Sequence, residues 1–159
     1  MRPEQKGFSL IELLIVVAII LIIAAIAIPN LMRARMSANE SSAAGSIRTI
    51  NTGEVSYAAS YPTVGFTSLP SLGGASPCTP STGTSCFVDN VLAGGTKEGY
   101  TFTATEGTSI NGMNTTYTSL GYPFSLNETG TRSFCSDQTG VIFYNVNATT
   151  CNNTNSILQ

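Results

Sequence analysis

The chain has 159 residues, a net charge of −2 and no histidine, a length that allows one modest domain with an accessory segment. Its seven basic residues are scattered, which excludes the clustered basic face of a dedicated nucleic-acid-binding protein. With single, separated carboxylates and no histidine, we expect no enzyme activity, no catalytic residues, no cofactor and no metal site.

The first predicted element is an apolar segment near the N-terminus. Residues 13–28, LLIVVAIILIIAAIAI, include no charged or polar side chain. The 21 residues from Phe8 to Ile28 match the ~20 residues that cross a hydrocarbon core of ~30 Å. A removable signal peptide has a shorter apolar run and a small-residue cleavage site, whereas this run ends in Ile-Pro-Asn. The sequence therefore predicts a retained transmembrane helix over residues 8–28.

A plain membrane anchor does not explain Glu12, because a carboxylate near the start of such a helix is costly and usually has a functional partner. Residues 7–12, Gly-Phe-Ser-Leu-Ile-Glu, resemble the cleavage motif of type IV prepilins and type II secretion pseudopilins. The polar leader MRPEQKG and the Ile-Pro that ends the apolar run extend the resemblance. These features taken together indicate the family much more specifically than any one of them alone.

The resemblance implies how the N-terminus is processed. Residues 1–7 are a leader peptide that a prepilin peptidase removes by cutting between Gly7 and Phe8, and Phe8 is then N-methylated. In the family, the residue corresponding to Glu12 is implicated in pairing with an N-terminal amine of its own or a neighbouring subunit. A buried carboxylate without a partner costs several kcal/mol, so Glu12 is expected to select the axial register of subunits.

The sequence departs from the family pattern in the middle of the apolar run. Leu21 stands where many relatives have glycine, which weakens a helix by about 1 kcal/mol relative to alanine. The resemblance suggests that the helix melts locally in a filament. That melting would depend mainly on Pro29, because proline removes an intrahelical hydrogen bond.

The helix is predicted to continue well beyond Pro29. An apolar stripe at helical spacing, predicted to pack on the head, consists of Ala44, Ile47, Ile50, Val55 and Ala58. Pro62 ends the pattern. A single helix over residues 8–61 would be roughly 80 Å long.

Residues 62–159 are predicted to form a globular head. Residues 62–80 are rich in Pro, Gly and Ser and indicate the loop between helix and sheet, and residues 86–92 indicate a short helix or turn. Four short strands are predicted over Tyr100–Ala104, Thr115–Ser119, Thr131–Cys135 and Val141–Val146, with a turn at residues 137–140. The predicted fold class is therefore α+β, with a long N-terminal helix whose apolar half protrudes and whose second half packs on a small antiparallel sheet.

All four cysteines lie in the head, at Cys78, Cys86, Cys135 and Cys151. An even count in a small, membrane-linked chain favours disulfides in an oxidising compartment. Seven and fifteen residues separate the neighbours, which does not fit the short spacing of zinc knuckles. Three pairings are possible. Nearest-neighbour closure, Cys78–Cys86 and Cys135–Cys151, is preferred, and the second bond resembles the disulfide-bounded C-terminal region of many pilin heads.

The resemblance implies a structural function, that of a major pilin whose helical homopolymer forms a type IV pilus for adhesion or motility. It implies a monomer held in the inner membrane with the head outside the cytoplasm, an extracellular filament after assembly, and an inner-membrane assembly platform and motor as partners. A type II secretion pseudopilin or a minor pilin is the alternative. Pseudopilins often bind calcium in the head and tend to lack cysteine pairs, and the sequence offers cysteines but no Asp/Asn-rich calcium loop.

Overall fold

A computed structural model describes residues 8–158 of the chain. Contacts divide the chain into two compact units, of which the first ends at Arg35 and the second begins at Met36. Helix α1, Leu10–Ser60, contributes to both units and includes Pro29 without interruption. The predicted single long helix is therefore confirmed, with ends within two residues of the expected ones.

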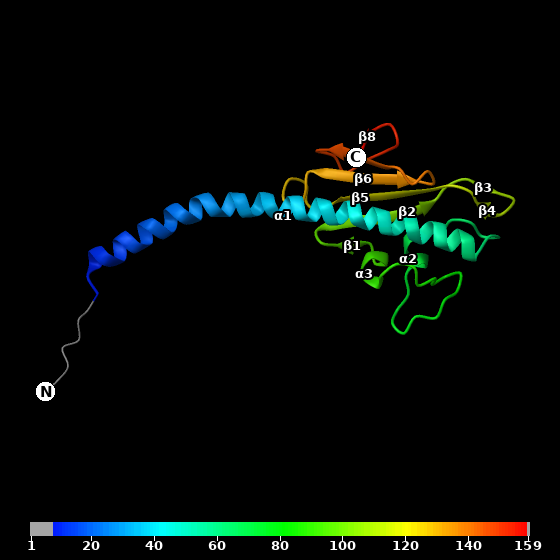
Figure 1. Ribbon diagram of the computed structural model, residues 1–159, viewed down its shortest axis with the longest axis horizontal. Coiled ribbons are helices and arrows are strands. Elements are labelled where there is room, and N and C mark those ends of the chain that lie inside the picture. Colours follow the sequence, from blue (N-terminus) through cyan, green and yellow to red (C-terminus); the bar gives the residue numbers. More distant parts are fainter. Residues whose placement is uncertain (1–7, 159) are drawn as a thin grey trace. The chain divides into compact units, whose positions relative to one another are not determined.

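The second unit, residues 36–158, is an antiparallel sheet with part of α1 packed on it. The six-stranded sheet has the order β1-β2-β5-β6-β7-β8, and every pair in it is antiparallel. In Figure 1 the second part of α1 runs alongside β2, β5 and β6. The strands are β1 (Thr96–Lys97), β2 (Tyr100–Glu106), β5 (Tyr117–Pro123), β6 (Arg132–Asp137), β7 (Ile142–Val146) and β8 (Ser156–Ile157).

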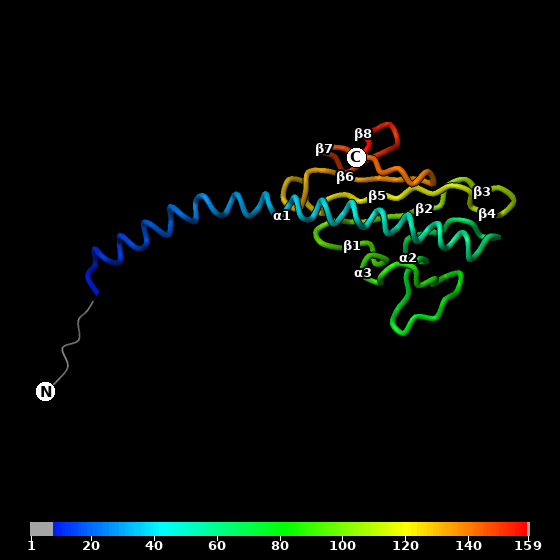
Figure 2. Tube along the Cα trace, viewed as in Figure 1, coloured from blue at the N-terminus to red at the C-terminus, as the bar shows by residue number. Residues whose placement is uncertain are grey.

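Smaller elements complete the head. A separate hairpin is formed by β3 (Ser109–Ile110) and β4 (Met113–Asn114). Two single-turn helices, α2 (Leu69–Leu72) and α3 (Asn90–Ala93), flank a loop that can be followed in Figure 2. Asp89 caps α3 by accepting a hydrogen bond from the Leu92 backbone N–H at 3.0 Å.

The hydrophobic core lies between α1 and the sheet. Ile47 and Ile50 are fully buried and contribute the helix side, while Phe102 and Phe134 contribute the sheet side. Along β2 the buried residues alternate with residues that point away from the helix, as expected for a sheet with one covered face. The α+β class predicted from the sequence is confirmed.

The register of the helix stripe differs from the prediction at one position. Ala44, Ile47 and Ile50 are buried as expected and Ala58 is half-buried, but Val55 is 61% exposed. Val55 is turned away because each residue advances about 100° around the helix, and Gly53, Glu54 and Tyr57 follow Ile50 on the buried face instead. The prediction placed the apolar Val55 on the buried face, whereas the polar Glu54 has the helical position that is buried.

The strand prediction was accurate for β2, β6 and β7 but displaced for β5. The predicted strand at 115–119 instead begins at Tyr117, because Thr115 and Thr116 hydrogen-bond to Thr108 at the base of the β3–β4 hairpin. The four two-residue strands and α2 were not predicted. Segments this short bury too little apolar surface to leave a periodic pattern in the sequence.

Candidate functional site

The predicted processing and assembly residues begin at the first turn of α1. Gly7 lies outside the described residues, and Phe8 precedes the helix with 90% of its surface exposed. The Ser9 backbone N–H donates a hydrogen bond of 2.9 Å to Glu12 Oε2. Ser9 directly precedes the helix and Glu12 is its third residue, so this contact is one half of a capping box. The carboxylate is thereby held at the helix end whose partial positive charge favours an anion.

The structure does not bring Glu12 and Pro29 together. Pro29 lies 17 positions after Glu12 in a continuous helix, which is about 25 Å along its axis. Pro29 causes no break in α1. The helix around it is exposed, and neighbouring helix residues such as Ile28 have more than half of their surface open.

In the part of the chain that the structure describes, the large apolar side chains of the first part of α1 are exposed. By length and composition α1 is the one helix among the described residues that is suited to cross a membrane. Its large side chains are exposed, with Leu10 at 75% and Ile22 at 63%. A large continuous patch of exposed apolar side chains on a folded protein marks a contact with lipid or with another protein.

Two disulfides join the head cysteines. Cys78 is bonded to Cys86, and Cys135 is bonded to Cys151, and the described residues include no free cysteine. The first bond closes the loop between α2 and α3. The second ties β6 to the C-terminal segment, which also adds β8 to the edge of the sheet beside β7.

Two buried carboxylates on α1 were not identified from the sequence, and the first anchors the helix to β6. Glu40 is 6% exposed. Its Oε1 accepts hydrogen bonds of 2.8 Å from both the backbone N–H and the hydroxyl of Thr131, and its Oε2 accepts one of 2.7 Å from Arg132 Nε. Burial raises the pKa of Glu40, but these hydrogen bonds and the Arg132 charge outweigh it and bring the pKa below its ordinary value.

The second carboxylate, Glu54, has far fewer partners. It is fully buried, Oε2 accepts one hydrogen bond of 3.0 Å from the Thr67 backbone N–H, and Oε1 has no hydrogen-bond partner among the described residues. The pKa of Glu54 is raised to about 7, mainly because the carboxyl group is buried. The Thr67 hydrogen bond lowers this pKa, and the negative charge of Glu106 raises it. Glu54 thus holds the loop after α1 with a group that titrates near neutral pH.

A half-buried amide, Asn51, lies between these carboxylates along α1. Asn51 donates to Ser136 Oγ at 2.8 Å and accepts from the Tyr117 hydroxyl at 3.1 Å, so it joins α1 to β5 and β6. Glu40, Asn51 and Glu54 share the helical spacing of Ile47, and that spacing alone could have placed them on the buried face. Because these side chains are polar, they were not expected from the sequence to lie on the buried face.

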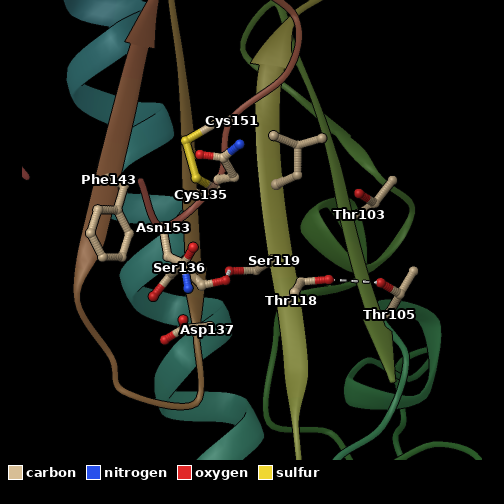
Figure 3. Close-up of a pocket in the computed structure, with 12 residues that line it drawn as sticks. Thr103, Thr105, Thr118, Ser119, Cys135, Ser136, Asp137, Phe143, Cys151 and Asn153 are labelled. Atoms are coloured by element: carbon tan, nitrogen blue, oxygen red, sulfur yellow. Dashed lines mark hydrogen bonds between the residues drawn. A yellow bond between two sulfur atoms is a disulfide. The ribbon is translucent and has the colours of Figure 1, made fainter. Parts of the chain in front are cut away.

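Figure 3 shows a pocket on the face of the sheet away from α1, beneath the segment that Cys151 ties to Cys135. Its volume is ≈ 330 Å³. Strands β2 and β5 contribute threonine hydroxyls, and the far wall includes the Phe143 ring. Asp137 is the only ionisable side chain among the described residues that line it, and one of its oxygens already accepts hydrogen bonds from Thr139. The described lining residues therefore lack the pair of acids that glycoside hydrolysis uses.

The described residues contain no group of three or more His, Cys, Asp or Glu side chains that could hold a metal ion.

The predicted site residues among the described residues fall into two separate sets. Phe8 lies just before α1, Glu12 and Pro29 lie in its first part, and the cysteines belong to the head.

Comparisons with known proteins bear on the N-terminal segment. Residues 2–28 match the family described as the prokaryotic N-terminal methylation motif. The type IV major pilin protein PilA of Myxococcus xanthus is 46% identical over 56 residues, which are 35% of this chain and 26% of that protein. The type IV wide pilus major component PilA4 of Thermus thermophilus is 65% identical over 37 residues, which are 23% of this chain and 28% of that protein. The chain thus spans about a quarter of the length of these curated relatives, and no solved structure matches it.

Proposed function

We propose that this chain, which carries the prepilin-type N-terminal methylation motif, is the major structural subunit of a type IV pilus. The observation that carries the proposal is the motif match over residues 2–28 on a chain whose apolar helix continues into a folded head. Two relatives that share part of the sequence are named as major pilus components. Both names describe structural proteins.

Processing would begin at the Gly7–Phe8 bond. A prepilin peptidase would cut there and N-methylate Phe8, leaving the apolar helix in the mature chain. The hydrogen bond between Ser9 and Glu12 supports this scheme, because it keeps the helix from extending back toward the cut. It also keeps the Glu12 carboxylate about one helical turn from the new amine, so Glu12 can pair with an amine of its own or a neighbouring subunit.

Assembly would move the apolar helix from lipid into a protein core. The monomer would be held in the inner membrane by residues 8–28 with its head outside the cytoplasm. An assembly platform and motor would extract it into an extracellular homopolymer in which neighbouring helices cover the exposed side chains of α1. Adhesion or motility is the expected use of such a filament. Any local unwinding of the helix on assembly would begin at Pro29, which cannot donate a backbone hydrogen bond.

The proposal is tested by negative-stain imaging of material sheared from cells. Cells that express Gly7→Val should retain the uncut chain in the membrane and shed no filaments, whereas wild-type cells shed filaments that contain this chain. Gly83→Ala is the matched control, since a methyl group there meets open space. Filaments built from the Gly7→Val chain would refute the processing scheme. If neither strain sheds filaments and the Gly7→Val cells alone lose protein secretion, the chain would be assigned to a secretion pseudopilus instead.

A further inference from the structure

The charged residues of the described chain are unevenly paired. The ion pairs are Lys97–Asp89 at 3.2 Å and Arg132–Glu40 at 2.7 Å. Three arginines have no ion-pair partner among the described residues, and all of them lie on α1: Arg33, Arg35 and Arg48. Glu98 and Glu128 are exposed carboxylates of the head, and neither has an ion-pair partner among the described residues. The chain therefore presents complementary charges on different elements.

One helical face combines a positive charge with apolar side chains. Ile28, Leu31, Met32 and Arg35 lie within about 100° of arc on α1, and we call them the basic-apolar face. The three apolar members are 58%, 70% and 52% exposed. Arg33 lies on the opposite side of the helix.

One patch of the head has the matching chemistry. Glu98, Phe124 and Glu128 form what we call the acidic-aromatic patch. The Phe124 backbone N–H donates to the Gly99 carbonyl at 2.9 Å, and the Ser125 hydroxyl donates to Glu128 Oε2 at 2.7 Å, so adjoining turns hold the three residues together. Phe124 is 78% exposed, the highest value for a large apolar side chain in the head.

The surface beside Phe124 is hollowed. An open hollow of ≈ 350 Å³ is lined by Glu98, Phe124, Tyr100 and Lys97, among others. Lys97 brings a positive charge to this hollow, but Asp89 neutralises it through their ion pair. The net character of the hollow and its rim is therefore apolar and acidic, which suits an apolar side chain followed by an arginine.

We propose that the acidic-aromatic patch of one subunit binds the basic-apolar face of a second copy of this chain. Phe124 packs on Leu31 and Met32 of the second copy, and the carboxylates of Glu98 and Glu128 receive its Arg35 guanidinium. The inference rests on the proposed function, because a homopolymer places many copies of both surfaces in contact. Charge and apolar complementarity together fix which neighbour is bound and in which register.

Charge reversal with compensation tests the pairing in filaments sheared from cells. Arg35→Glu should lower the yield of sheared filaments at least about tenfold at an equal amount of membrane-held monomer, because like charges then meet in every contact. Glu98→Arg with Glu128→Arg should have the same effect. The triple variant, which reverses both surfaces of every copy, should recover most of the yield. Phe124→Ala, at an exposed position, should also reduce it.

Arg33→Glu is the matched control, with the same charge change on the other side of the helix. Its phenotype should not be rescued by Glu98→Arg with Glu128→Arg. Wild-type yield from Arg35→Glu, or loss that the triple variant does not restore, would overturn the inference, and the second result would assign Arg35 to anionic lipid at the membrane surface. Absence of filaments from the wild-type chain itself would instead overturn the proposed function, and the inference with it.

Discussion

Replacement of Glu54 by glutamine should change the pH dependence of head stability. Glu54 is fully buried, and among the described residues its carboxylate accepts one hydrogen bond, from the Thr67 backbone N–H at 3.0 Å. Glutamine retains an oxygen that can accept this hydrogen bond but never ionises. Comparison of the two proteins across pH therefore isolates the cost of the buried negative charge.

The sign and size of the effect follow from the pKa. Burial raises the pKa of Glu54 from its ordinary value of 4.5 to about 7. The folded state thus holds the proton more tightly than the unfolded state. The contribution of Glu54 to stability is complete below the ordinary pKa and is lost as the pH rises through about 7. This difference in pKa corresponds to about 3 kcal/mol, so Glu54→Gln should gain about 3 kcal/mol relative to wild type between about pH 4 and pH 8.5.

The assay is urea unfolding of the full chain in non-ionic detergent, with disulfides intact, followed by near-ultraviolet circular dichroism. Buried tyrosines such as Tyr57 and Tyr117 report on loss of packing. Glu40→Gln is the matched control, and its effect has the opposite sign. The pKa of Glu40 lies below its ordinary value, so its contribution is present at neutral pH and is lost on acidification. Parallel pH profiles for wild type and Glu54→Gln would refute the reasoning.

Three further perturbations test other parts of the structure. Cys135→Ser with Cys151→Ser opens a loop of sequence separation 16 and should lower the free energy of unfolding by about 3 kcal/mol, measured by urea unfolding; a loss below ~1 kcal/mol would contradict a constraining role for the bond. Gly121→Ala would place a methyl group 2.8 Å from the ring of Phe102 and should cost about 1–3 kcal/mol in the same assay, whereas unchanged stability would show that the ring can move freely. Glu12→Ala should speed amide exchange at the start of α1 in micelles by several-fold, and Glu12→Gln should do so less because it retains an acceptor; equal rates in all three proteins would exclude the capping contact.

Much of the first part of the chain could be predicted from the sequence because its information is local. An uncharged run of membrane length, a single carboxylate at Glu12 and the proposed cut site between Gly7 and Phe8 lie within one short stretch. The match over residues 2–28 concerns this same stretch. The strands β2, β6 and β7 were also predictable, since their alternating or aromatic patterns reflect one buried face.

The polar core of the head could not be predicted in this way. Glu40 and Glu54 look alike in the sequence, as single carboxylates on one helix. Their difference arises from residues far along the chain. Thr131 and Arg132 donate three hydrogen bonds to the first, whereas among the described residues the second accepts a hydrogen bond only from the Thr67 N–H.

The sequence by itself determined the long helix, the membrane-length apolar segment and the α+β class, because periodicity and composition act over neighbouring residues. The tertiary structure decided which polar side chains are buried, that Val55 faces outward, and that Glu98, Phe124 and Glu128 share a surface. Those features depend on contacts between residues tens of positions apart, and a linear pattern does not encode which distant donor reaches a buried oxygen.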